Sequence, residues 1–230
     1  MKKTIWMVVG AVLAASVVAA TAQEVLAQNS IGYIKRQLPP GGDLITVSLP
    51  LHSMTAETHV FTNLSLATEA PLGSSVSFWD VHAQRWVGGS RGGRGWDANV
   101  KTQVIAAGEF FFLKGPAVST VTNEITITGE LPNESIWTHN ILGSSALGNM
   151  ANPYPADFVF GTSSLASNAT LGSSVSFWDV NSQRWVGGSK GGRGWDANVR
   201  TQVVSATEGF FLRQAGAATQ WTVTKPYTWP

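Results

Sequence analysis

An internal duplication constrains this sequence more than any other feature. Residues 72–114 and residues 171–213 align without a gap at a constant offset of 99, and 34 of the 43 aligned positions are identical. The differences are mostly conservative, such as Arg91 against Lys190. A segment repeated this closely folds into the same structure twice, so the chain predicts two homologous units of roughly a hundred residues each.

Weaker similarity on either side of this block sets the expected boundaries of the units. Residues 124–128 and residues 220–224 share the same alternation of apolar and polar side chains. Between the two copies, Pro132 lies in a short polar stretch that is typical of a turn. We therefore expect a first unit over residues 28–131 and a second unit over residues 132–230.

The pattern within each unit is that of strands. Short stretches rich in Val, Ile, Thr, Phe and Trp alternate with Gly, Pro, Asn and Ser, and only residues 62–68 have a helix-like pattern. The sequence predicts an all-β fold of about six strands per unit. We expect two small sandwiches or barrels around a pseudo-twofold axis, with two independent beads as the alternative. In the first unit the predicted strands are residues 44–49, 76–81, 85–87, 109–113 and 121–128.

One predicted strand is apolar on both faces. Residues 110–113 read Phe-Phe-Phe-Leu, and residues 209–212 of the second unit read Gly-Phe-Phe-Leu. A strand without polar alternation is typical of the middle of a sheet that is covered on both sides. Packing these strands of the two units against each other is one way to build a sufficient core.

The first residues of the chain have the layout of a secretory signal peptide. Lys2 and Lys3 precede an uncharged stretch over residues 4–20, and small residues follow. We expect residues 1–27 to be the signal peptide, with cleavage after Ala27 or, as second choice, after Ala22. The apolar stretch is short for a membrane anchor, and no basic cluster follows it. The sequence thus predicts a protein that is secreted, periplasmic or at the cell surface.

Composition narrows the remaining function classes. The chain has no Cys, so stability must come from burial without disulfides, and a zinc site is not expected. Removing Lys2, Lys3 and Glu24 leaves equal numbers of basic and acidic residues, whereas a nucleic-acid binder is expected to be basic. No later segment is long and apolar enough for a membrane span. We expect no cofactor, and the sequence leaves the oligomeric state open.

Aromatic and charged residues recur around a glycine-rich stretch, residues 88–95, that we interpret as a loop. Trp79 and Trp178 lie in the middle of predicted strands and are expected in the core. A flat indole beside Arg and Asp can grip a sugar ring if it is partly exposed, and Trp86 and Trp96, which flank the loop, are expected to lie less deeply than the mid-strand tryptophans. A loop held down by its own tryptophans, with local Arg–Asp pairs, is the alternative. The candidate ligand-binding residues are Trp86, Arg94, Trp96 and Asp97, with Trp185, Arg193, Trp195 and Asp196 in the second unit.

No catalytic motif has the context that its chemistry needs. Residues 88–92 spell G-x-S-x-G, but a nucleophile elbow needs a following helix inside an α/β sheet. Asp80, Asp97 and Glu109 could in principle form a carboxylate pair for glycoside cleavage, but the sequence does not give their separation. We therefore expect no enzymatic activity and no catalytic residues.

Each unit resembles a repeat of exported bacterial proteins of largely uncharacterised function. That resemblance implies export and a β fold, and it implies neither a catalytic activity nor any functional residues. The second unit lacks a clear Gly-Tyr opening, and the first unit has Phe110 where the repeat has Gly. The motifs that carry the resemblance are Gly32-Tyr33, Leu38-Pro39, Leu44-Ile45, residues 49–51, Trp79-Asp80, residues 109–112, residues 129–132, residues 152–154, Trp178-Asp179 and residues 208–211.

Three functions fit these observations. The first is a non-catalytic envelope or extracellular protein with a structural or interaction role. The second is a carbohydrate-binding module with two equivalent tryptophan and arginine loops that gain avidity on a polymer. The third is a hydrolase. Across the three functions, the expected partners are polysaccharide or other envelope proteins. Exposed Trp86 and Trp96 would favour sugar binding, whereas the same rings buried under the loop would favour a structural role.

Overall fold

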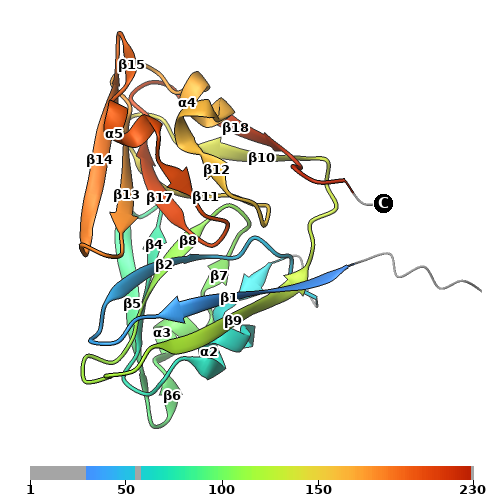
Figure 1. Cartoon of the computed structure of the whole chain (residues 1–230), viewed down its shortest axis with the longest axis vertical. Helices are drawn as coiled ribbons and strands as arrows, with labels where there is room; N and C mark the ends of the chain where they lie inside the picture. Colours follow the sequence, from blue (N-terminus) through green and yellow to red (C-terminus); the bar gives the residue numbers. More distant parts are fainter. Residues whose placement is uncertain (1–29, 55–57, 229–230) are drawn as a thin grey trace, which may run out of the picture.

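The computed structural model describes residues 30–54 and 58–228. The predicted signal peptide, residues 1–27, therefore lies outside the described residues. The chain is all-β, as predicted, with eighteen strands and only short helices within the described residues. Each half of the chain contributes nine strands in the same order, more than the sequence predicted (Figure 1).

The elements of the two halves correspond one to one. In the first unit they are β1 (Ile31–Leu38), β2 (Leu44–Ser48), β3 (His59–Val60), the 3₁₀ helix η1 (Phe61–Asn63), α2 (Ser65–Glu69), β4 (Ser75–Asp80), β5 (Arg85–Gly92), β6 (Gly95–Trp96), α3 (Ala98–Lys101), β7 (Val104–Ile105), β8 (Phe110–Lys114) and β9 (Asn123–Glu130). In the second unit they are β10 (Ile136–Ile141), β11 (Leu147–Ala151), β12 (Phe158–Val159), η2 (Phe160–Thr162), α4 (Ser164–Asn168), β13 (Ser174–Asp179), β14 (Arg184–Gly191), β15 (Gly194–Trp195), α5 (Ala197–Arg200), β16 (Val203–Val204), β17 (Gly209–Arg213) and β18 (Thr219–Thr224).

Each unit contains a five-stranded antiparallel sheet, a two-stranded ribbon that covers it, and one further short pair of strands, β3-β7 or β12-β16. The sheet orders are β2-β8-β4-β5-β6 and β11-β17-β13-β14-β15, and the ribbons are β1-β9 and β10-β18. In the first unit, Leu38 and Ile125 of the ribbon share one buried cluster with Val47 and Phe78 of the sheet. The core of each unit thus lies between its ribbon and its sheet, as in a small sandwich.

The phenylalanine-rich strand is central and buried on both faces, as predicted. β8 pairs with β2 on one side and with β4 on the other. Phe111 and Leu113 point into the core of their own unit, while Phe110 and Phe112 join Phe211 of the other unit in a separate buried cluster. The alternation of side chains along β8 therefore gives one face to each unit. The two units share a core and are not independent beads.

The glycine-rich stretch is a β-hairpin, so its interpretation as a loop was wrong. β5 continues to Gly92, and β6 begins at Gly95. A Cβ at Gly89 would lie 2.8 Å from Cγ1 of Val100. Glycine is therefore required here because α3 packs directly on the strand backbone, and not because the chain turns.

One difference between the copies is explained at the interface between the units. Phe110 of β8 corresponds to Gly209 of β17 in the alignment. A Cβ at Gly209 would lie 2.2 Å from Cγ of Phe110, and the Phe110 and Phe211 rings lie 5.0 Å apart. Only one of the two positions can carry a large side chain, so the units had to diverge there.

We predict that Gly209→Ala destabilises the protein by about 1–3 kcal/mol, because the added methyl group overpacks against Phe110. The measurement is the free energy of unfolding in urea, with Gly191→Ala as the matched control. A Cβ at Gly191 meets nothing within 4 Å, so that variant should stay within about 0.5 kcal/mol of the parent. Equal stability of the two variants would contradict the packing described here.

Candidate functional site

Trp96 and Trp195 are part of the core. Their exposed fractions are 6% and 7%. The indole Nε1 of Trp96 donates to the Ala67 carbonyl at 2.8 Å, and that of Trp195 donates to the Ala166 carbonyl at 2.9 Å. Each ring also packs edge-on against a phenylalanine at 4.9 Å. With both the ring and its donor satisfied inside the protein, these tryptophans hold the hairpin down and offer no face to a ligand.

Asp97 and Asp196 close the same hairpins. Oδ2 of Asp97 accepts hydrogen bonds from the Ser90 backbone N–H at 2.8 Å and from the Ser90 hydroxyl at 3.1 Å. Asp196 accepts the corresponding bonds from Ser189 at 2.8 and 3.3 Å. These carboxylates hold their own backbone in place. The hairpins at Asp97 and Asp196 are therefore ordered by Asp–Ser hydrogen bonds and not by the Arg–Asp pairs that were expected around the loop.

The structure separates the candidate arginines from Trp86 and Trp185. Arg94 and Arg193 are exposed at the hairpin tips, between β5 and β6 and between β14 and β15. Trp86 lies near the start of β5, and the six steps along the strand from Trp86 to Gly92 span roughly 20 Å. The tips with β6 and β15 lie at opposite ends of the molecule (Figure 1). The expected grip of a tryptophan and an arginine on one ligand is thus not formed.

Trp86 and Trp185 instead meet at one place, where the two units join. Their exposed fractions are 46% and 41%. The Trp86 ring lies 5.5 Å from the Phe112 ring and 5.8 Å from the Phe211 ring. The Trp185 ring lies 5.7 Å and 5.3 Å from the same two rings. We call these four aromatic residues the aromatic seam. The two predicted sites therefore become one composite surface.

Reciprocal hydrogen bonds hold the units in this arrangement. Nε1 of Trp79 donates to the Leu147 carbonyl at 2.8 Å, and Nε1 of Trp178 donates to the Leu44 carbonyl at 2.8 Å. Leu44 and Leu147 are the first residues of β2 and β11. Each bond thus has a counterpart from the opposite unit, which defines an approximate twofold axis. Trp79 and Trp178 are half-buried in this interface and not in the core of a unit, where we expected them.

Two glutamines that the sequence analysis did not single out complete these bonds. The Gln84 amide accepts from the Leu147 N–H at 2.8 Å and donates to the Leu147 carbonyl at 3.1 Å. Gln183 makes the same pair of bonds to Leu44 at 2.8 and 3.2 Å. Both glutamines have a positive φ, 51° and 50°, which a non-glycine residue adopts only rarely. Their identity in both copies was the one available signal, and it did not distinguish them from 33 other identical positions.

The carboxylates considered for glycoside cleavage do not converge as a set. Asp80 pairs in register with Arg85 at the start of β5, whereas Asp97 bonds to Ser90 near the end of that strand. Two backbone N–H groups, of Ala83 and His82, donate to Asp80. The Ala83 bond and its neighbours lower the pKa of Asp80 despite some desolvation. Asp80 thus closes its turn as an ionised carboxylate.

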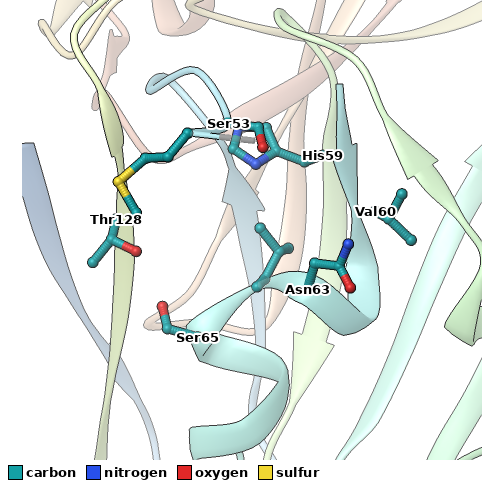
Figure 2. Close-up of a pocket in the computed structure, with 8 residues that line it drawn as sticks. Ser53, His59, Val60, Asn63, Ser65 and Thr128 are labelled. Atoms are coloured by element: carbon teal, nitrogen blue, oxygen red, sulfur yellow. The ribbon is translucent and has the colours of Figure 1, made fainter. Parts of the chain in front are cut away.

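A separate small pocket lies in the first unit, beside the start of α2 (Figure 2). Its volume is about 110 Å³, and Ser65, Thr128 and Asn63 present polar groups to it. Nε2 of the buried His59 lies 2.6 Å from the Leu51 carbonyl. Since a carbonyl can only accept, this nitrogen carries the hydrogen. Burial lowers the pKa of His59, against an opposing contribution from the Leu51 bond, so the ring is neutral at pH 7 and serves as a core residue.

Stability should fall on acidification because of His59. The pKa of His59 in the folded protein lies below the ordinary 6.5, so the unfolded chain binds the proton more readily. As pH drops below about 6.5, protonation therefore stabilises the unfolded state, and the free energy of unfolding decreases. Burial lowers the pKa of His139 as well, so His59→Gln should remove only part of the pH dependence. The measurement is the unfolding free energy between pH 8 and pH 5, with the exposed His82→Gln as control. If the unfolding free energy of His59→Gln depended on pH as steeply as that of the parent protein, this prediction would be contradicted.

Comparisons with known proteins gave no relative. No family model, no curated protein and no solved structure matches this chain. Among residues 30–54 and 58–228, no helix is long and apolar enough to cross a membrane. The same residues contain no group of three or more His, Cys, Asp and Glu side chains that could hold a metal ion.

Proposed function

We propose that this protein is an exported, non-catalytic structural or interaction protein of the cell envelope or the extracellular space. The two repeat units act as one body in this role. Export rests on the sequence of residues 1–27, and a lack of catalysis rests on the absence of a motif in its required context. The structural role rests on the contacts that residues repeated in both units make inside the protein.

One observation carries this proposal: Trp96 and Trp195 are buried beneath their own hairpins, with their indole N–H groups bonded inside the protein. Two further positions that are identical in both copies also serve the fold. Asp97 closes a hairpin, and Gln84 joins the units. The identity of these positions thus has a structural explanation that needs no ligand.

Carbohydrate binding is the second candidate, and one specific observation favours it. Trp86 and Trp185 of the aromatic seam are large apolar residues that remain 46% and 41% exposed. Gly88 and Ser90 follow Trp86 on the same face of β5 and are also exposed. Alternate residues of a strand share a face, so the indole is continued by a flat row of small residues. A sugar chain could lie along such a surface with its rings on the indoles.

The two candidates are separated by a glycan-binding experiment with the mature protein, residues 28–230. Immobilised polysaccharides and a glycan array are screened with tryptophan fluorescence as readout. The test variant combines Trp86→Leu with Trp185→Leu, which keeps apolar contact with the phenylalanines but removes the flat rings. The matched control combines Arg94→Ala with Arg193→Ala at the hairpin tips. Circular dichroism verifies that both variants are folded.

We expect no glycan to bind if the protein is purely structural. Binding that the seam variant weakens by about tenfold or more, with the tip variant unchanged, would replace this function with the carbohydrate-binding one. Binding lost only in the tip variant would contradict both roles as assigned here. Release of reducing ends from any bound polysaccharide would contradict a non-catalytic protein.

A further inference from the structure

The two sides of the interface between the units differ in charge. On one side, Arg36 of β1 reaches across to the second unit. Its Nη2 lies 3.2 Å from Oε1 of Glu208, and its Nη1 donates to the Thr207 hydroxyl at 3.1 Å. Nη2 also donates to the Thr46 carbonyl at 3.2 Å. A guanidinium thus fills this side and neutralises Glu208.

The other side has the same carboxylate but no arginine. Glu109 corresponds to Glu208 at the offset of 99. His139 corresponds to Arg36, because β10 pairs His139 with Trp221 where β1 pairs Arg36 with Ile125. The shorter His139 ring stacks on Trp137 at 5.3 Å. Among the described residues, no ion pair joins it to Glu109.

Both carboxylates are held in the same way by their own turn. Oε2 of Glu109 accepts from the Ala106 N–H at 3.2 Å, and Oε2 of Glu208 accepts from the Ser205 N–H at 3.4 Å. Oε1 of Glu208 receives Arg36, whereas none of the described residues donates a hydrogen bond to Oε1 of Glu109. Burial raises the pKa of Glu109, against smaller opposing contributions from the Ala106 bond and from the nearby His82, as expected for a desolvated carboxylate without a Lys or Arg beside it.

A cavity of about 430 Å³ lies beside Glu109. Asn140 and Asn149 present polar groups to it, and Val81 and Met150 present apolar ones. Its walls come from both units and include His82 and His139, but no Lys or Arg is among the described residues that line it. On the opposite side a hollow of about 230 Å³ remains beside Glu208, but Arg36 already neutralises that carboxylate.

We propose that the cavity beside Glu109 binds the guanidinium group of an arginine side chain from a partner peptide. The Arg36 side of the same interface shows which group this carboxylate accepts. A guanidinium is planar and presents paired donors to a carboxylate, and its methylene stem packs on apolar side chains such as Val81 and Met150. The site uses neither Trp86 nor Trp185, so it stands independently of the function proposed above.

The test is calorimetric titration of the mature protein with N-acetyl-arginine amide, with a short arginine-containing peptide and with free arginine. N-acetyl-citrulline amide is the uncharged analogue of the same shape. We expect the arginine compounds to bind and the citrulline compound to bind about tenfold more weakly or not at all. If the peptide binds most tightly, the natural ligand is an arginine within a peptide. If free arginine binds most tightly, the assignment to a partner peptide would be overturned. Stronger binding of N-acetyl-lysine amide would overturn the guanidinium assignment.

Three variants locate the site. Glu109→Gln keeps the shape of the side chain and should weaken binding by about tenfold or more. Glu208→Gln is the matched control on the filled side and should leave the affinity unchanged. His139→Arg recreates the Arg36 arrangement and should abolish binding by occupying the cavity. Unchanged affinity in a folded Glu109→Gln protein, or equal binding of citrulline, would overturn the proposal.

Discussion

Phe110, Phe112 and Phe211 pack between the two five-stranded sheets, and the rest of the molecule depends on this contact. Burying one such ring contributes roughly 2 kcal/mol, and the chain has no Cys with which to form a disulfide instead. A sheet with apolar side chains on both faces would leave one face in water if its unit stood alone. The duplication therefore produced a single body in which each unit covers the other.

The hydrogen bonds of Gln84 and Gln183 add direction to this apolar contact. Hydrophobic packing alone is non-directional and would tolerate several placements of one sheet on the other. Each glutamine amide pairs with both backbone groups of one leucine in the opposite unit. Since each intramolecular hydrogen bond adds a modest net stabilisation, the placement that forms all four bonds is favoured over the others. This explains why a turn residue with an unfavourable φ is the same in both copies.

The general architecture could be predicted from the sequence, and the arrangement of the candidate site could not. The repeat and the strand alternation are local signals, and they sufficed for the all-β fold and for the two-sided strand at residues 110–113. β1 was missed because no stretch over Ile31–Leu38 stood out from its polar neighbours, and Tyr33 on it is 69% exposed. The hairpin over residues 88–95 was missed because Gly89 makes room for Val100, a contact that only the folded chain reveals.

The relation between Glu109 and His139 was also beyond the reach of sequence. Each residue belongs to a different unit, so their juxtaposition depends on the placement of one sheet on the other. The alignment did show that Glu109 and Glu208 are identical, but Arg36 and His139 lie outside the near-identical block and could be matched only through strand register. Positions where two paired copies diverge are thus the places where a symmetric body can gain a single, asymmetric site.

The approximate twofold axis also changes what the duplication can do for binding. Two equivalent sites on separate loops would raise affinity for a polymer through avidity, provided that both can engage at once. The structure places Trp86 and Trp185 around the same two phenylalanines. Of the predicted ligand-binding residues, the hairpin tips carry only Arg94 and Arg193. Any ligand of the aromatic seam would therefore meet one composite surface, and its affinity would depend on both indoles together. Duplication in this protein would then build one larger surface, and it would not repeat a smaller one.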